Sequence, residues 1–222
     1  MSHLTSTDRI EITLVVLKAM RGESRALEML IDRFDERLLY FVRRMITDPH
    51  GARDIVQETW ICVFRTLPRL RDPQAFQSWL YKIAHRFVAR DLRTQYRRRE
   101  DELIPDIVDD SADDVEMRAD QAGMIHTALS ELSPPHREVL LLRFMEEFSL
   151  DDIAAALEIP LGSVKSRLHH AKLALRQVID RQKEEPEGGS YDADVGICRR
   201  WHKRYRTKMY RAWQARPHSD FP

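Results

Sequence analysis

Apolar residues recur at helical spacing along most of the chain. Between Ala26 and Met45 they step by three or four positions, which places one apolar stripe on one face of an α-helix. A second stripe runs over 55–66 and a third over 76–92. No stretch alternates convincingly enough to be a strand, so the pattern predicts an all-α protein. The stripes are Ala26, Leu30, Phe34, Leu38, Phe41 and Met45; Ile55, Thr59, Cys62, Val63 and Thr66; and Phe76, Leu80, Ile83, Phe87 and Leu92.

Prolines and charge runs divide this pattern. Pro49 disfavours helix at Asp48, and the two prolines within Leu67–Gln74 predict a loop. From Asp101 to Asp120 nine acidic residues stand against a single Arg, a composition that repels itself and buries little. Helical spacing resumes with Ile125, Leu129 and Leu132, followed by a predicted cap at Ser133 and a proline at the first helical position, Pro134.

These breaks predict two small helical bundles joined by an acidic flexible linker. We expect an N-terminal domain over residues 1–100, the linker over 101–121, a C-terminal domain over 122–183, and a second linker with a tail over 184–222. The tail is basic and aromatic between Ile197 and Arg216. Two interpretations of this tail remain open, a disordered basic segment and a functional extension.

The stretch EIPLGSVKSRLHHAK, from Glu158 to Lys172, has the layout of a helix-turn-helix. Ser149 and Asp152 predict a capping box for a short helix that ends near Glu158, and Ser163 predicts the cap of the next helix. The start of such a second helix can enter the major groove of DNA. A capped helical hairpin in an ordinary bundle is the alternative. Candidate DNA contacts are Lys165, Ser166, Arg167, His169 and His170.

The third stripe lies among cations and aromatic rings, a mixture that can stack unpaired bases and follow a nucleic-acid backbone. Phe76 and Phe87 occupy stripe positions, so a core role is the larger part of their interpretation. Trp79 and Tyr81 fall off the stripe centre and are candidates for base stacking. The cations are Lys82, Arg86, Arg90 and Arg93.

The face opposite the second stripe is mixed and mainly acidic, with an isoleucine at its centre. Such a face could dock a partner, and a solvated helix surface is the simpler alternative. Its residues are Asp54, Gln57, Glu58, Ile61 and Arg65.

Composition restricts the class of protein. The 36 basic residues balance the 36 acidic ones, and 43% of residues are apolar, so the chain can fill real cores. Cys62 and Cys198 are the only cysteines, which fits a reducing compartment and predicts no structural zinc site. We expect no membrane insertion, no cofactor and no metal, and a cytoplasmic location. No Gly-rich loop or nucleophile setting indicates an enzyme.

Taken together, these motifs resemble the extracytoplasmic-function (ECF) sigma factors of bacterial RNA polymerase. ARDIVQETWICVFRTL (Ala52–Leu67) is similar to the polymerase-docking helix of that family, and FQSWLYKIAHRFVARDLR (Phe76–Arg93) to its promoter-melting helix. SLDDIAAALEIPLGSVKSRLHHAK (Ser149–Lys172), behind LSPPHREVLLLRF, is similar to its reader of the upstream promoter element. The three motifs follow in the family's order, from about Leu14 to Val178.

The resemblance implies a promoter-specificity subunit that is not an enzyme. Its partners would be the clamp and flap of core RNA polymerase, promoter DNA and, as often in the family, an anti-sigma factor. The implied polymerase contacts are Asp54, Gln57, Glu58 and Arg65. The implied contacts to the −10 element are Arg71, Phe76, Trp79, Lys82, Arg86, Arg90 and Arg93. The implied contacts to the −35 element are Ser163, Lys165, Ser166, Arg167, His169 and His170.

Three positions depart from the family's usual pattern and leave the promoter sequence open. Arg86 stands where Asn is common, Ser163 where Thr is common, and His170 where Arg is common. The alternative function is an autonomous helix-turn-helix regulator. That reading predicts tight binding of the isolated protein, as a dimer, to two-fold symmetric sites.

Overall fold

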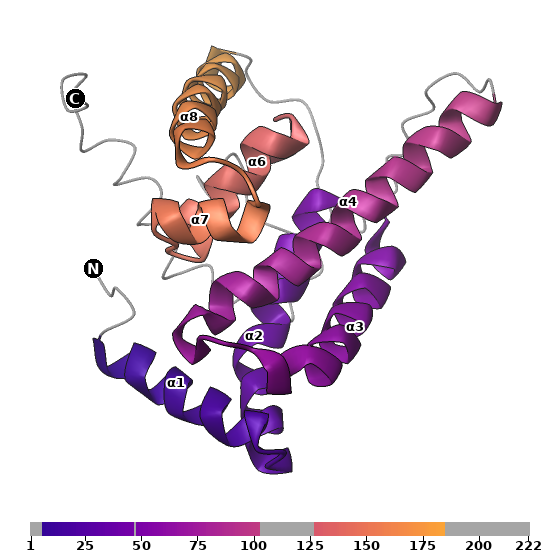
Figure 1. Ribbon diagram of the computed structural model, residues 1–222. Coiled ribbons are helices and arrows are strands. Elements are labelled where there is room, and N and C mark those ends of the chain that lie inside the picture. Colours follow the sequence, from indigo (N-terminus) through magenta and orange to yellow (C-terminus); the bar gives the residue numbers. More distant parts are fainter. Residues whose placement is uncertain (1–5, 47, 103–126, 185–222) are drawn as a thin grey trace. The chain divides into compact units, whose positions relative to one another are not determined.

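The computed structural model describes residues 6–46, 48–102 and 127–184, and every regular element within these ranges is a helix (Figure 1). The prediction of an all-α protein is therefore confirmed. The chain divides into two compact units. Of the described residues, one unit contains 6–46, 48–102 and 146–166, and the other contains 127–145 and 167–184. We call them the first and the second unit.

The predicted linkers lie mostly outside the described residues. Helix α4 runs from Phe76 to Glu102, so the first two positions of the predicted 101–121 linker are helical. The rest of that linker, the predicted helical position Ile125 and the tail over 185–222 lie outside the described residues.

The first unit begins with α1 (Ser6–Met20), a helix that the apolar pattern did not predict. Its apolar residues fall on more than one side, because Ile12 and Val16 are buried while Ile10 and Leu14 are exposed. A helix with apolar residues on several faces shows no single stripe. Gly22, with φ of +86°, then turns the chain into the next helix, in a conformation that favours glycine.

Helices α2 (Ser24–Met45) and α3 (Pro49–Thr66) supply much of the core of this unit. All six residues of the first predicted stripe are buried, as expected for a helix face turned to a core. The second stripe is partly wrong. Cys62 is only half-buried, whereas Trp60, which lies outside the predicted stripe, is buried and donates its indole N–H to Asp35 Oδ1 at 3.0 Å.

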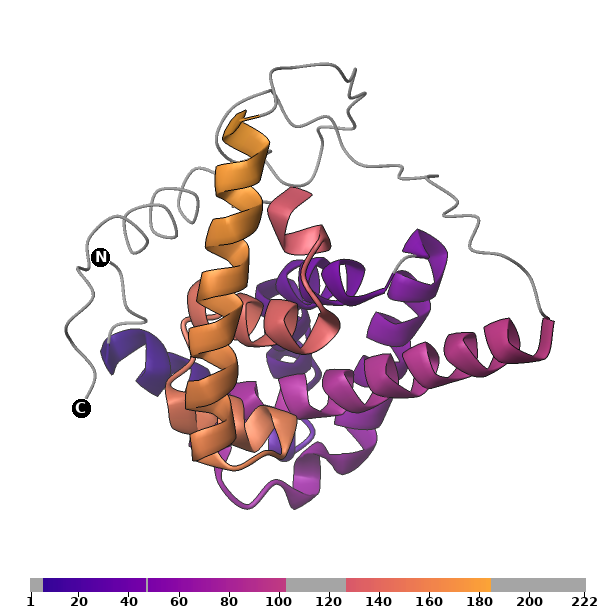
Figure 2. The ribbon, with the colours of Figure 1, turned by 90° about the horizontal axis from the view of Figure 1, so that it is seen from above.

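The predicted loop between α3 and α4 contains two 3₁₀ turns, η1 (Leu67–Arg69) and η2 (Pro73–Ala75). The Asp72 carboxylate accepts a hydrogen bond from the backbone N–H of Gln74 at 2.9 Å and so caps the second turn. Helix α4 then passes beside α3. Its last turns extend beyond α3 in both views (Figures 1 and 2).

Residues 146–166 complete the first unit and pack on α4. The Tyr81 ring, fully buried, makes edge-on contacts with Phe41 and Phe148, with centroids 5.2 and 5.3 Å apart. Beside them Arg37 of α2 pairs with Glu146, both side chains being buried. The contacts on this segment therefore combine aromatic packing with a buried ion pair.

Helix α7 (Leu150–Leu157) confirms the predicted capping box. The Ser149 hydroxyl accepts from the Asp152 backbone N–H at 3.0 Å, and Asp152 Oδ2 accepts from the Ser149 N–H at 3.1 Å. The helix is flanked by two glutamates with positive φ, Glu147 at 58° and Glu158 at 54°. Both occupy the left-handed region, which disfavours a residue with a Cβ.

The second unit contains helical residues 127–130, α6 (Pro134–Leu140), the π turn η3 (Leu141–Met145) and residues 167–184 of α8 (Leu161–Glu184). Pro134 takes the predicted first helical position. Ser133 stands at the cap position, but its side chain makes no capping hydrogen bond. Arg137 closes the turn before α6 by donating to the backbone oxygens of Leu129, Ser130 and Leu132.

Candidate nucleic-acid interface

Four cations follow one another along α4. Lys82, Arg86, Arg90 and Arg93 are separated by four, four and three residues, which places them on one face of the helix in successive turns. The three arginines are exposed, and Lys82 is half-buried. This row, which we call the α4 cation row, could follow a chain of phosphates.

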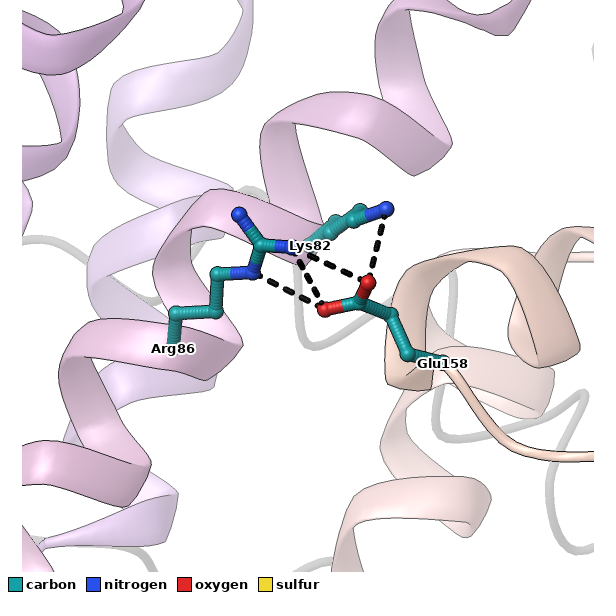
Figure 3. Close-up of polar contacts among 3 residues, drawn as sticks. All are labelled: Lys82, Arg86 and Glu158. Carbon is teal, nitrogen blue, oxygen red and sulfur yellow. Dashed lines mark hydrogen bonds and ion pairs between the residues drawn. The ribbon is translucent and has the colours of Figure 1, made fainter.

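The first two members of the row bind a carboxylate (Figure 3). Arg86 donates from Nε to Oε2 of Glu158 and from Nη2 to Oε1, both at 2.9 Å, and Lys82 Nζ lies 3.0 Å from Oε1. Two parallel hydrogen bonds from one guanidinium are the strong bidentate arrangement for carboxylate and phosphate. Hydrogen bonds from Lys82 and then from Arg86 hold the pKa of the Glu158 carboxyl below its ordinary value of 4.5.

Glu158 occupies an unusual position for a charged side chain. It ends α7 with φ of 54° and ψ of 40°, and its N–H bonds back to Ala154 O. Helices that end in the left-handed conformation usually place Gly or Asn there. The turn alone therefore does not account for a glutamate, whereas the contact with Lys82 and Arg86 uses its carboxylate.

The other two members of the row are also held. Arg90 pairs with Glu58 of α3, and its guanidinium lies 4.9 Å from the centroid of the Phe87 ring. Arg93 donates from Nε to the Ala89 carbonyl oxygen of its own helix at 2.9 Å. These contacts orient both arginines, which nevertheless stay exposed.

The aromatic residues near the row separate into core and surface. Phe76 has no exposed surface and packs edge-on against Phe34, with centroids 5.6 Å apart. A fully buried ring cannot stack on a base, so the prediction of Phe76 as a DNA contact is corrected: it is a core residue. Tyr81 is corrected for the same reason. Trp79 is half-buried and stays a candidate.

The mixed face of α3 is exposed along its whole predicted length. Asp54, Gln57, Glu58, Ile61 and Arg65 all lie on the surface. The sequence interpretation missed Phe64, an exposed ring that stacks on Trp60 with centroids 5.8 Å apart. Because Phe64 lies three positions after Ile61, it adds a second apolar group to this face.

The start of α8 carries the predicted helix-turn-helix surface. Lys165, Ser166, His169 and His170 are exposed, and Arg167 is half-buried. Ser163 is also half-buried. The prediction that Ser163 caps this helix is wrong. Helix α8 begins earlier, at Leu161, and the Val164 N–H already bonds to Pro160 O at 3.1 Å. Arg71, in the turn before α4, is exposed.

The described residues contain no group of three His, Cys, Asp or Glu that could hold a metal ion. None of the described helices combines the length and the apolar character needed to cross a membrane.

Two segments of the chain match known family descriptions. Residues 30–98, from α2 to α4, match Sigma-70 region 2, and residues 122–175 match Sigma-70, region 4. The ECF RNA polymerase sigma factor SigW of Bacillus subtilis is 25% identical over 177 residues, covering 73% of this chain and 93% of that protein. The RNA polymerase sigma-E factor of Streptomyces avermitilis is 32% identical over 163 residues, covering 72% and 88%. The chain belongs to the ECF group of the sigma-70 family.

Two solved structures share the fold of this sigma factor. One is CnrH in complex with the cytosolic domain of CnrY, with a TM-score of 0.56 and 20% identity over 77% of this chain and 97% of that one. The other is the sigma factor RpoE of Bartonella quintana in complex with the anti-sigma factor NepR. Its TM-score is 0.61, with 21% identity over 69% of this chain and 96% of that one.

Membership of the family gives the chain its function: it directs promoter-specific transcription with RNA polymerase. The region 2 match contains the exposed face of α3 and the α4 cation row. The region 4 match contains α7 and the start of α8. Sequence reasoning missed the contact of Glu158 with Lys82 and Arg86. The signal was a glutamate where a helix would ordinarily end in glycine, but its partner Arg86 lies 72 residues away.

Proposed function

We propose that three surfaces of this sigma factor divide promoter recognition between them. The exposed face of α3 binds the clamp of core RNA polymerase, the α4 cation row with Trp79 and Arg71 binds the −10 element, and the start of α8 reads the −35 element. The proposed polymerase contacts are Asp54, Gln57, Glu58 and Arg65. The proposed −35 contacts are Ser163, Lys165, Ser166, Arg167, His169 and His170.

The observation that carries the proposal is the α4 cation row. Lys82, Arg86, Arg90 and Arg93 lie on one face of a long helix, within the segment that matches region 2. Phosphate contacts of this kind position a protein on nucleic acid without reading its sequence. Sequence recognition then falls to base contacts, for which Trp79 on α4 and the polar start of α8 are suited.

In this proposal core polymerase performs nucleotidyl transfer, and the sigma factor supplies recognition and capture of the open strand. It therefore acts in the cytoplasm, where polymerase works, and has no catalytic residues of its own. Two DNA-binding surfaces of modest strength gain affinity when one large partner holds both at the promoter spacing. An anti-sigma factor is a further proposed partner, since the fold is shared with RpoE, solved with NepR.

Run-off transcription with core polymerase tests the assignment of α8. We expect the double variant Lys165→Ala with Arg167→Ala to lose roughly tenfold or more of its transcripts, because direct base and phosphate contacts disappear. Arg176→Ala is the matched control, since Arg176 lies on the same helix and pairs with Asp180. Equal transcription by the double variant and the control would overturn the assignment.

A further inference from the structure

Lys82 and Arg86 form a complete anion site on the surface of α4. Arg86 presents two N–H groups in parallel, each 2.9 Å from a carboxylate oxygen, and Lys82 adds an ammonium at 3.0 Å. A phosphate group offers the same kind of oxygen pair to a guanidinium. The site that binds Glu158 in this structure is therefore suited in charge and geometry to a nucleic-acid phosphate.

Glu158, whose carboxylate binds this site, has a strained backbone conformation. Glu158 has a left-handed backbone conformation that glycine adopts with less strain, and its side chain is 43% exposed. Arg86 is 61% exposed, so the pair lies at the surface, where an incoming anion can reach it. Because the pair is exposed, salt screens it and a competing anion can exchange with the carboxylate, although the contact is bidentate.

We propose that the Glu158 carboxylate occupies the Lys82–Arg86 site in the free protein and that a DNA phosphate replaces it on binding. This inference rests on the proposed role of the α4 cation row in binding the −10 element. Carboxylate and phosphate cannot occupy one guanidinium fork together, so each weakens the binding of the other. Glu158 thereby couples the segment 146–158 to DNA binding by α4, and it lowers the affinity of the free sigma factor for DNA.

Removal of the carboxylate tests this competition directly. In the full-length chain we expect Glu158→Gln to bind a fluorescently labelled 20-nucleotide oligo-dT roughly fivefold more tightly, by anisotropy at low salt. Asp151→Asn is the matched control, because it removes one exposed negative charge from the same helix. Asp151→Asn should change the affinity for oligo-dT much less than Glu158→Gln does. Glu158→Gly, which relieves the backbone strain and also removes the carboxylate, should bind as tightly as Glu158→Gln.

A double-mutant cycle separates the competition from a general effect of charge. In a Lys82→Ala, Arg86→Ala background, Glu158→Gln should no longer raise the affinity, because the shared site is gone. An equal gain in that background, or no gain from either Glu158 variant, would overturn the exchange. If Lys82→Ala with Arg86→Ala binds oligo-dT as tightly as wild type, the proposed DNA-binding role of α4 fails instead. The two failures are therefore distinguishable.

Discussion

Arg37 and Glu146 form a buried ion pair that joins α2 to the segment before α7. Nη2 of Arg37 lies 2.7 Å from Oε2 of Glu146, and the two side chains are only 8% and 4% exposed. Charges withdrawn from water in this way depend strongly on each other. The pair therefore makes the attachment of residues 146–166 to the first unit sensitive to a single substitution.

Substitution of one residue of the Arg37–Glu146 pair should lower the free energy of unfolding much more than replacement of both by apolar residues. Glu146→Gln removes the negative charge that lies 2.7 Å from the buried Arg37 guanidinium, and we expect it to lower the free energy of unfolding by about 3–5 kcal/mol. The double variant Arg37→Met with Glu146→Leu should recover most of that loss, because apolar groups of similar volume carry no desolvation penalty. Urea unfolding measures both, and a double variant no more stable than Glu146→Gln would contradict the prediction.

The two serines before α7 and α8 should behave differently. Ser149→Ala removes the hydroxyl of the capping box and should lower stability by roughly 0.5–2 kcal/mol. Ser163→Ala should leave stability nearly unchanged, because α8 begins before it, at Leu161. Thermal unfolding followed by circular dichroism compares them. Equal losses would indicate that Ser163 caps α8 after all.

Alanine substitutions at Tyr81 and at Trp79 should have different effects, because Tyr81 is a core residue and Trp79 is only half-buried. Tyr81→Ala removes a fully buried ring between Phe41 and Phe148 and should cost about 3–5 kcal/mol of stability. Trp79→Ala, at a half-buried position, should cost less stability but reduce promoter opening, because the proposed stacking surface is lost. Permanganate footprinting of the open strand, beside thermal unfolding, distinguishes the two. Normal opening by Trp79→Ala would remove Trp79 from the proposed interface.

The contact between Glu158 and its cations predicts a pH dependence of stability. Because the folded-state pKa of Glu158 lies below 4.5, its ion pairs stabilise the fold above pH 4.5 and are lost as pH falls through the folded-state pKa. Wild type should therefore melt slightly above Glu158→Gln at neutral pH, and the two should converge in acid. The pairs are exposed, so the difference corresponds to under about 1 kcal/mol. A difference in melting temperature that stays constant into acid would contradict this account.

Periodicity predicted those parts of the fold that one helix determines by itself. The stripe of α2, from Ala26 to Met45, could be read from spacing because its single buried face faces the core along its whole length. Helix α1 could not, because Ile10 and Leu14 are apolar but exposed. The capping box at Ser149 needed only residues three positions apart, and it too was predicted correctly.

The candidate site was harder to predict than the helices, because it depends on contacts between residues far apart in the sequence. The spacing of Arg86, Arg90 and Arg93 placed them on one exposed face of α4, but the burial of Phe76 is set by Phe34 on another helix. The pairing of Glu158 with Arg86 joins positions 72 residues apart, and no local pattern signals it. Sequence reasoning thus found the charged surfaces and missed the carboxylate that one of them binds.

All the surfaces assigned above serve one activity, the direction of core RNA polymerase to specific promoters. Run-off transcription from genomic fragments, with purified core polymerase and mapping of transcript starts, measures that activity. We expect discrete starts that require the protein and share upstream and downstream sequence elements at a fixed spacing. Association with core polymerase without discrete starts, or no association in any buffer, would contradict the account.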